Sequence, residues 1–327
     1  MADGRHTTDL QGTLGAMVLP GGSEHTAPDD LRQLAAHLAE PVTLAGGTGP
    51  LAALDTGPAE HGTVLLVAGY TGSKEDFAPL LTPIADAGLR GVAVDQRGQF
   101  ESPGPDDPAQ YTVAELAADV IAVARQLRAR SAGPLHLVGH SFGGLVARAA
   151  VLAEPTLVDS LTLLGSGPAS LSGPRAELLD HLSPLLDAGG VQLVNDTLEQ
   201  LAMTDPRAQA VPAPTREFLR RRFLANNAAG LRGMADAMLG EPDRVAELAA
   251  TGVPVLVAHG IADDAWSPAA QADMAQRLGA RHEVIGHAVH SPAIENPART
   301  AAVLLSFWAD PLGTSTVPTE TETEAAR

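Results

Sequence analysis

The chain has 327 residues, a length that suits one large domain or one domain that carries an insertion. Hydrophobic residues make up 45% and charged residues 18%, an ordinary globular composition that excludes disorder over most of the length. Lys and Arg number 21 against 39 Asp and Glu, so the net charge of -18 would repel a nucleic acid partner. Cysteine is absent, which excludes disulfides, thiolate catalysis and cysteine-based metal sites.

The two ends of the chain differ from its middle. Residues 1–41 carry no strong strand pattern and are interpreted as an N-terminal extension, in which Asp29 to Ala39 could form a short helix. Met1 to Leu19 has no apolar run of signal-peptide length, so the sequence predicts a cytoplasmic protein without a membrane partner. Residues 311–327 are rich in Thr and Glu from Thr314 onward, a composition that predicts a disordered tail.

Between these ends, short apolar runs alternate with helical patterns. Leu116, Val120, Val123 and Leu127 recur at helical spacing, and a second helical pattern begins at Phe142. Strands that are apolar on both faces favour a parallel sheet covered by helices, so the fold class is α/β. The runs that predict strands are Thr63 to Ala68, Gly91 to Asp95, Leu135 to Gly139, Ser160 to Leu164, Val253 to Ala258 and Arg281 to Ile285.

The interval 167–250 interrupts this alternation with leucine-rich stretches, several prolines and a helical run from Thr215 to Leu224. It is interpreted as a helical cap inserted into a core formed by residues 42–166 and 251–310. An insertion at this point would lie over the carboxyl ends of the strands, where open α/β sheets bind their ligands. The cap is therefore expected to act as a lid.

A Gly-x-Ser-x-Gly pattern spans Gly139 to Gly143, between a predicted strand and a predicted helix. A turn this tight holds its serine in a strained conformation, and flanking glycines let the neighbouring backbones approach. Ser141 is therefore the candidate nucleophile.

A serine hydroxyl needs a base to take its proton and a third group to orient that base. Two candidate carboxylates, Asp263 and Asp264, follow the predicted strand that ends at Ala258. Two candidate histidines, His287 and His290, follow the strand that ends at Ile285. All four lie beyond strand carboxyl ends, on the same side as Ser141.

These motifs together resemble the α/β-hydrolase superfamily, in its lid-bearing bacterial branch, over about residues 42–310. The resemblance implies an eight-stranded, mostly parallel sheet with helices on both faces, and a triad on loops at its C-terminal edge. It also implies activities that range over esterases, lipases, thioesterases, C–C bond hydrolases, perhydrolases and some lyases, among which the family does not choose. The segments that carry the resemblance are Leu65 to Phe77, Asp95 to Ser102, Gly139 to Leu145, His259 to Trp266 and His290 to Pro292.

The resemblance also implies a role for particular residues. His290, in a His-Ser-Pro segment just before a helix, corresponds to the base, with His287 as the alternative. Asp263, three residues after Gly260, corresponds to the acid. Asp264 stays open as the alternative, because the proline that the family usually has four residues after the acid is here Ser267.

The oxyanion hole is implied at two backbone N–H groups, those of Phe142 and Tyr70. In front of Tyr70, the family's usual His-Gly pair is here Ala68-Gly69.

The candidates for substrate contact are His140, Phe218, Phe223 and Trp266, although a histidine beside the nucleophile is more often a packing residue. The loop Asp95 to Gly98 is interpreted as structural, and Arg220 to Arg222 as a solvated helix face. The spacing of His282, His287 and His290 matches no standard metal site, so neither a metal nor a cofactor is expected.

The sequence therefore predicts a serine hydrolase that acts on an ester or related acyl group of a small molecule through an acyl-enzyme. Two alternatives remain: a lyase, cyclase or perhydrolase on the same fold, and a ligand-binding protein with little turnover. Family members that use an aspartate nucleophile are disfavoured by Ser141.

Overall fold

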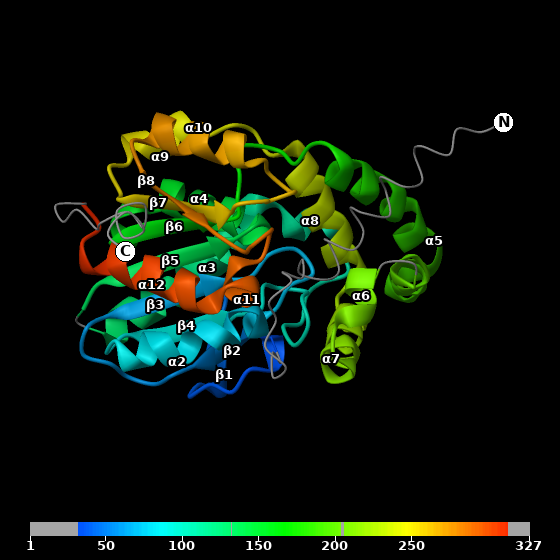
Figure 1. Ribbon diagram of the computed structural model, residues 1–327, viewed down its shortest axis with the longest axis horizontal. Coiled ribbons are helices and arrows are strands. Elements are labelled where there is room, and N and C mark those ends of the chain that lie inside the picture. The colour runs from blue at the N-terminus through cyan, green and yellow to red at the C-terminus, as the bar shows by residue number, and fades with distance from the viewer. Residues whose placement is uncertain (1–31, 132, 204–205, 313–327) are drawn as a thin grey trace, which may run out of the picture.

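The computed structural model describes residues 32–131, 133–203 and 206–312 (Figure 1). Most of the predicted N-terminal extension and of the predicted tail lies outside the described residues. A single eight-stranded sheet forms the centre of the molecule, as expected. Its strands are β1 (Glu40–Ala45), β2 (Pro50–Asp55), β3 (Thr63–Val67), β4 (Arg90–Val94), β5 (Leu135–His140), β6 (Ser160–Leu164), β7 (Val255–Gly260) and β8 (Arg281–Ile285).

The strands are arranged in the order β1-β2-β4-β3-β5-β6-β7-β8. β2 runs antiparallel to both of its neighbours, while every pair from β4 to β8 is parallel. Every residue of β3 to β7 is buried, which is typical of parallel strands covered on both faces. The mostly parallel sheet is therefore confirmed.

Helices cover both faces of this sheet (Figure 1). α2 (Ala78–Asp86) and α12 (Pro297–Ala309) pack on one face, with the short α11 (Pro292–Glu295) beside them. The opposite face is covered by α3 (Val113–Arg130), α4 (Phe142–Ala153) and α10 (Pro268–Leu278). In α3, the residues at helical spacing named above are all buried against the sheet. Short 3-10 turns, η1 (Arg32–Leu34), η2 (Lys74–Phe77), η3 (Pro108–Tyr111) and η4 (Pro155–Leu157), connect these elements.

Among the described residues between β6 and β7 there are five helices: α5 (Pro174–Ala202), α6 (Pro206–Ala210), α7 (Ala213–Leu224), α8 (Ala228–Gly240) and α9 (Val245–Ala250). α5 to α8, called the cap below, stand beside the carboxyl ends of the strands (Figure 1). α5 is broken at Gly190, whose φ of 65° and ψ of -162° are not helical and suit a residue without a Cβ. α9 packs instead on α4 and α10, so it belongs with the core rather than with the cap. No helix within the described residues is long and apolar enough to cross a membrane.

A buried histidine makes the stability of this sheet depend on pH. His136 of β5 lies 2.8 Å from Ser160 Oγ and stacks on Trp308 of α12. Burial lowers the pKa of His136 to about 4, so the folded protein binds its proton more weakly than the unfolded chain does. The stability that this histidine contributes is full above its unfolded pKa of about 6.5 and is lost as the pH falls toward 4.

We expect His136→Gln to flatten the dependence of the free energy of unfolding on pH between about 6.5 and 4, by about 1–3 kcal/mol over that window. Urea unfolding at a series of pH values measures this. His181→Gln, at an exposed position of α5, is the control and should leave the slope as in the wild type. If the His136→Gln variant kept the wild-type dependence of the unfolding free energy on pH, His136 would not be its source.

Candidate active site

Ser141 occupies the turn between β5 and α4 in a strained conformation, with a φ of 53° and a ψ of -123°. Such backbone conformations cost about 1–3 kcal/mol and persist only where the surroundings impose them. Here a Cβ on Gly139 would lie 2.3 Å from the carbonyl oxygen of Gly143, and a Cβ on Gly143 would lie 2.4 Å from that of Val67. The two glycines of the motif therefore allow the close approach that the turn requires.

His290 connects this serine to a carboxylate. Its Nε2 lies 2.9 Å from Ser141 Oγ, and its Nδ1 lies 3.0 Å from Asp263 Oδ1. The three side chains follow β5, β7 and β8, so the parallel sheet brings together residues far apart in the sequence. All three residues are buried, with exposed fractions of 8% for Ser141, 7% for His290 and 5% for Asp263.

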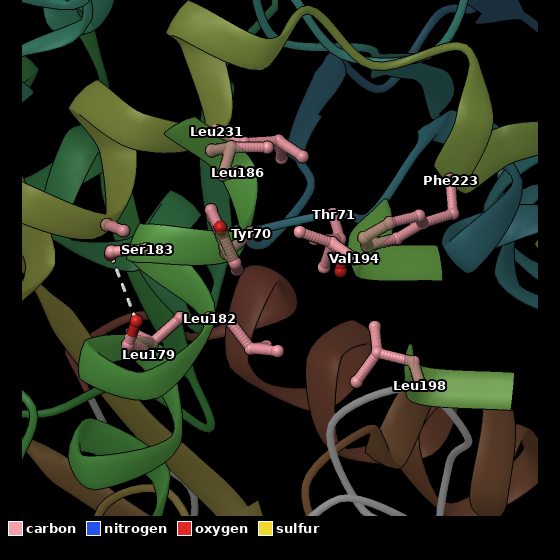
Figure 2. Close-up of a pocket in the computed structure, with 11 residues that line it drawn as sticks. Tyr70, Thr71, Leu179, Leu182, Ser183, Leu186, Val194, Leu198, Phe223 and Leu231 are labelled. Atoms are coloured by element: carbon pink, nitrogen blue, oxygen red, sulfur yellow. Dashed lines mark hydrogen bonds between the residues drawn. The ribbon is translucent and has the colours of Figure 1, made fainter. Parts of the chain in front are cut away.

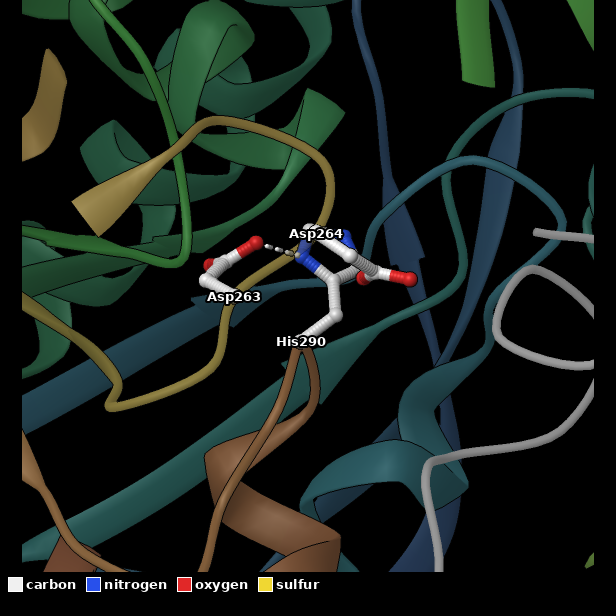
Figure 3. Close-up of side chains that lie close together, drawn as sticks. All are labelled: Asp263, Asp264 and His290. Atoms are coloured by element: carbon white, nitrogen blue, oxygen red, sulfur yellow. Dashed lines mark hydrogen bonds and ion pairs between the residues drawn. The ribbon is translucent and has the colours of Figure 1, made fainter. Parts of the chain in front are cut away.

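Asp263 is held by three groups, of which Figure 3 shows His290. Besides His290, the backbone N–H of Ala265 donates to Oδ1 at 3.0 Å and Gln271 Nε2 donates to Oδ2 at 3.0 Å. Burial alone would raise the pKa of Asp263, but the electrostatic interaction and hydrogen bond with His290, together with these two donors, lower it below its ordinary value. The carboxylate therefore stays charged and fixes the histidine with Nδ1–H facing it.

The alternative carboxylate and the alternative histidine have different surroundings. Asp264 is exposed, and its carboxylate points away from the contact between Asp263 and His290 (Figure 3). It accepts a hydrogen bond of 2.5 Å from Arg175 at the start of α5. His287 is exposed as well, with a left-handed φ of 55°. The contact from Ser141 Oγ to a carboxylate therefore runs through His290 to Asp263.

Two groups of side chains place possible metal-ligand atoms close together. Among the described residues, the ligand atoms of Asp263, Asp264 and His290 lie within 4.8 Å of one another. Each of them already has a hydrogen-bond partner, however, and an ion would have to displace the contacts of Asp263. His282 Nε2 lies instead 2.9 Å from His259 Nε2. These donor sets do not fit a built metal centre.

Two backbone N–H groups remain for an oxyanion. Phe142 is the first residue of α4, and Tyr70 lies in the turn after β3; in the described chain neither N–H donates to another group. The turn packs directly on the serine, since a Cβ on Gly69 would lie 3.0 Å from Ser141 Cβ. Gln96 Nε2 donates to the carbonyl of Ala68 at 2.8 Å, and Gln99 Nε2 to that of Gly69 at 2.9 Å.

The loop after β4 thus supports this turn, in keeping with the structural role expected for Asp95 to Gly98. Arg97 is turned away and buried, with its Nε 2.8 Å from Asp119 Oδ2. The side-chain amides of Gln96 and Gln99, rather than the charged side chain of Arg97, therefore contact the turn beside Ser141.

His140, beside the nucleophile, contacts the backbone of the loop that carries His290. Its Nε2 donates to the backbone carbonyl of His290 at 2.7 Å, so the proton is on this nitrogen. Burial, and then the nearby His290, lower the pKa of His140 to about 4, which keeps the ring neutral. This contact holds the loop that carries His290, which favours packing over substrate contact.

A narrow apolar cavity, partly open to solvent, lies between the cap and the turn that carries Tyr70 (Figure 2). Tyr70 and Thr71 form one wall, and helices α5, α7 and α8 form the others. No charged side chain of the described residues lines it. The cap side chains that line it are Leu179, Leu182, Ser183, Leu186, Val194, Leu198, Phe223, Leu231 and Ala235.

Of the residues predicted to contact the substrate, one lines this cavity and two others have different contacts. Phe223 lines it, whereas Phe218 packs edge-on against Phe100 at 5.8 Å, in a separate buried cluster. Trp266 lies over Gly167, and its Nε1 donates to the carbonyl of Ala169 at 3.1 Å. These contacts favour structural roles for Phe218 and Trp266.

The interpretation of Arg220 to Arg222 as a solvated face is wrong for one of the three. Arg220 and Arg221 are exposed, but Arg222 is buried, with an exposed fraction of 8%. Its Nη1 lies 2.6 Å from Asp76 Oδ1. The reason is its position on α7, where it shares a buried face with Thr215, Phe218 and Leu219.

The strand order, together with a strained serine at the turn between strand and helix, defines an α/β fold with a nucleophile-type turn. The sequence profile described as alpha/beta hydrolase fold matches residues 62–297, and the chain belongs to this family.

Individual relatives carry different names. RutD of Variovorax paradoxus (strain S110), named as a carbamate hydrolase, is 40% identical over 134 residues, 41% of this chain. The chain matches only about half the length, 48%, of that relative. A Bacillus subtilis (strain 168) protein named as 2-succinyl-6-hydroxy-2,4-cyclohexadiene-1-carboxylate synthase is 24% identical over 78% of this chain and 93% of its own. A thermophilic esterase from Thermogutta terrifontis has the same fold, with a TM-score of 0.68 at 22% identity over 84% of this chain and 99% of that one.

Proposed function

We propose that this protein is a serine hydrolase that cleaves an ester of a small, neutral molecule through an acyl-enzyme. The observation that carries the proposal is the continuous contact from Ser141 Oγ through His290 to Asp263, beside two N–H groups with no other acceptor. The names of the relatives support hydrolysis in general and do not choose the bond.

The geometry supports the following steps. Ser141 Oγ attacks the ester carbonyl carbon while His290 Nε2 takes its proton, and the oxyanion accepts hydrogen bonds from the N–H groups of Tyr70 and Phe142. His290 then returns the proton to the leaving alcohol, and the acyl group stays on the serine. A water that gives its proton to His290 attacks the acyl carbon, and the acid leaves as Ser141 recovers its proton.

The cavity indicates which group the substrate carries. Its walls are apolar, and the polar side chains among them are Tyr70, Thr71 and Ser183, of which Ser183 Oγ already donates to the carbonyl of Leu179. A carboxylate placed there would lose its hydration without gaining a cation. We therefore expect a neutral, apolar group on the substrate.

Labelling with a fluorophosphonate probe and turnover of a panel of p-nitrophenyl esters test this function. We expect a fluorophosphonate to label Ser141, and p-nitrophenyl esters to be hydrolysed with a preference for apolar acyl chains over an acyl chain that ends in a carboxylate. Leu186→Phe, which narrows the cavity, should shift the preference toward shorter chains by about 1–3 kcal/mol in kcat/KM ratios. Leu193→Phe, at a 36% exposed position of the same helix, is the matched control and should keep the wild-type preference.

The name of the Bacillus subtilis relative keeps the lyase or cyclase alternative open, and the isotope content of the product separates the two. Hydrolysis in H2(18)O places 18O in the released acid, whereas elimination or cyclisation does not. Turnover without 18O, or the absence of both turnover and labelling, would contradict the proposed function.

A further inference from the structure

Asp76 lies beneath the turn that carries Tyr70. The turn is closed by the N–H of Gly72, which donates to the carbonyl of Gly69 at 3.1 Å. Asp76 Oδ2 accepts from the N–H of Ser73 at 3.1 Å, and it lies so close to Gly72 that a Cβ there would be 2.6 Å from it. One carboxylate oxygen therefore holds the downstream end of the turn.

The other oxygen of Asp76 faces two segments from outside the turn. Oδ1 accepts from Arg222 Nη1 at 2.6 Å and from Gln33 Nε2 at 3.0 Å. Arg222 comes from α7 of the cap, and the same Nη1 lies 3.5 Å from Ser73 Oγ. The guanidinium is thus the cap's charged contact with the segment that forms the turn.

The turn packs directly against the serine and the histidine before it. Gly69 is packed on Ser141 and on His140, with a Cβ on Gly69 only 3.0 Å and 3.3 Å from their nearest atoms. Thr71, between Tyr70 and Gly72, has a left-handed φ of 59°, which a non-glycine residue keeps only when its surroundings impose it. Without the contacts that Asp76 makes, we expect the turn to relax from this strained conformation.

We propose that Arg222 is a positioning residue, which through Asp76 keeps the Tyr70 N–H directed at the oxyanion only while the cap is seated on the core. This inference rests on the proposed function, because it assumes that the oxyanion forms beside Tyr70. Seating of the cap and completion of the oxyanion hole are then one event. A substrate that binds in the cavity and keeps the cap on the core therefore also completes the oxyanion hole.

A purely structural ion pair would stabilise the protein without any special effect on the tetrahedral state. The two roles are separated by comparing kcat, KM, the melting temperature and the affinity for a boronic acid. A boronic acid forms a tetrahedral adduct with the serine and places an oxygen in the oxyanion hole, so its affinity reports that hole directly.

We expect Arg222→Met to lower kcat for p-nitrophenyl esters by about 10- to 100-fold, less than the loss of a complete oxyanion donor, with KM changed by less than about 3-fold. The affinity for phenylboronic acid should fall in parallel with kcat. Arg222→Lys, which keeps the charge, should recover most of the loss. Arg221→Met, at the exposed neighbouring position, is the matched control and should retain wild-type kcat.

The Asp76→Asn variant tests the same link from its other end. Because both side chains act through one contact, the Asp76→Asn/Arg222→Met double variant should lose little more kcat than the more affected single variant. Additive losses, an unchanged boronic acid affinity, or a kcat that follows only the melting temperature would overturn the inference. Wild-type protein that lacks turnover and serine labelling would instead overturn the proposed function, so the two failures are distinguishable.

Discussion

Ser141→Ala is expected to abolish ester hydrolysis, with a loss in kcat of about 10⁶-fold, the size seen when a serine nucleophile is removed from a triad. The physical reason is that the described site offers no second hydroxyl within hydrogen-bond distance of His290 Nε2. The fold should persist, because alanine is smaller than serine and its Cβ occupies the same space at the turn. Steady-state kinetics and fluorophosphonate labelling measure the effect.

The control for this variant is its stability. Its melting temperature should lie within a few degrees of the wild-type value, and cooperative unfolding should be retained. Labelling of the alanine variant at another residue, or hydrolysis within tenfold of the wild-type rate, would show that Ser141 is not the nucleophile.

The central strands were predictable from the sequence because their residues are apolar on both faces. The predicted run Val253 to Ala258 and the observed β7 differ by two residues at each end, and Ser160 to Leu164 coincides with β6. β1 and β2 gave no such signal. β1 has one buried residue, Leu44, while its other residues are exposed or partly buried and include a proline, as in many sheet-edge strands.

Some residues of the candidate site were likewise predictable from the sequence and others were not. Ser141, Asp263 and His290 were reachable because local motifs fix their backbones at strand ends, and the sheet then determines where those ends meet. The roles of cap residues depend instead on how four helices pack, including the break at Gly190. For Arg222 a signal did exist, since it stands four residues after the apolar Phe218 and therefore on the same helix face.

The second large effect concerns the two adjacent carboxylates. Asp263→Asn is expected to lower kcat by about 10⁴-fold, because an amide facing His290 Nδ1 can favour the wrong tautomer and no longer stabilises the imidazolium. Asp264→Asn should lower kcat by less than tenfold. Its carboxylate contacts Arg175 at the start of α5, so its loss should appear mainly in the melting temperature.

These two substitutions remove the same negative charge from neighbouring positions, so each controls for the other. A general electrostatic contribution to catalysis would give similar losses, since both carboxylates lie near His290. A contribution through orientation requires the contact of 3.0 Å that Asp263 makes and Asp264 does not. Comparing kcat for the two variants at saturating substrate, over a range of pH, decides between these accounts. Equal losses would mean that the hydrogen bond to His290 Nδ1 is not what the histidine needs in order to act as the base.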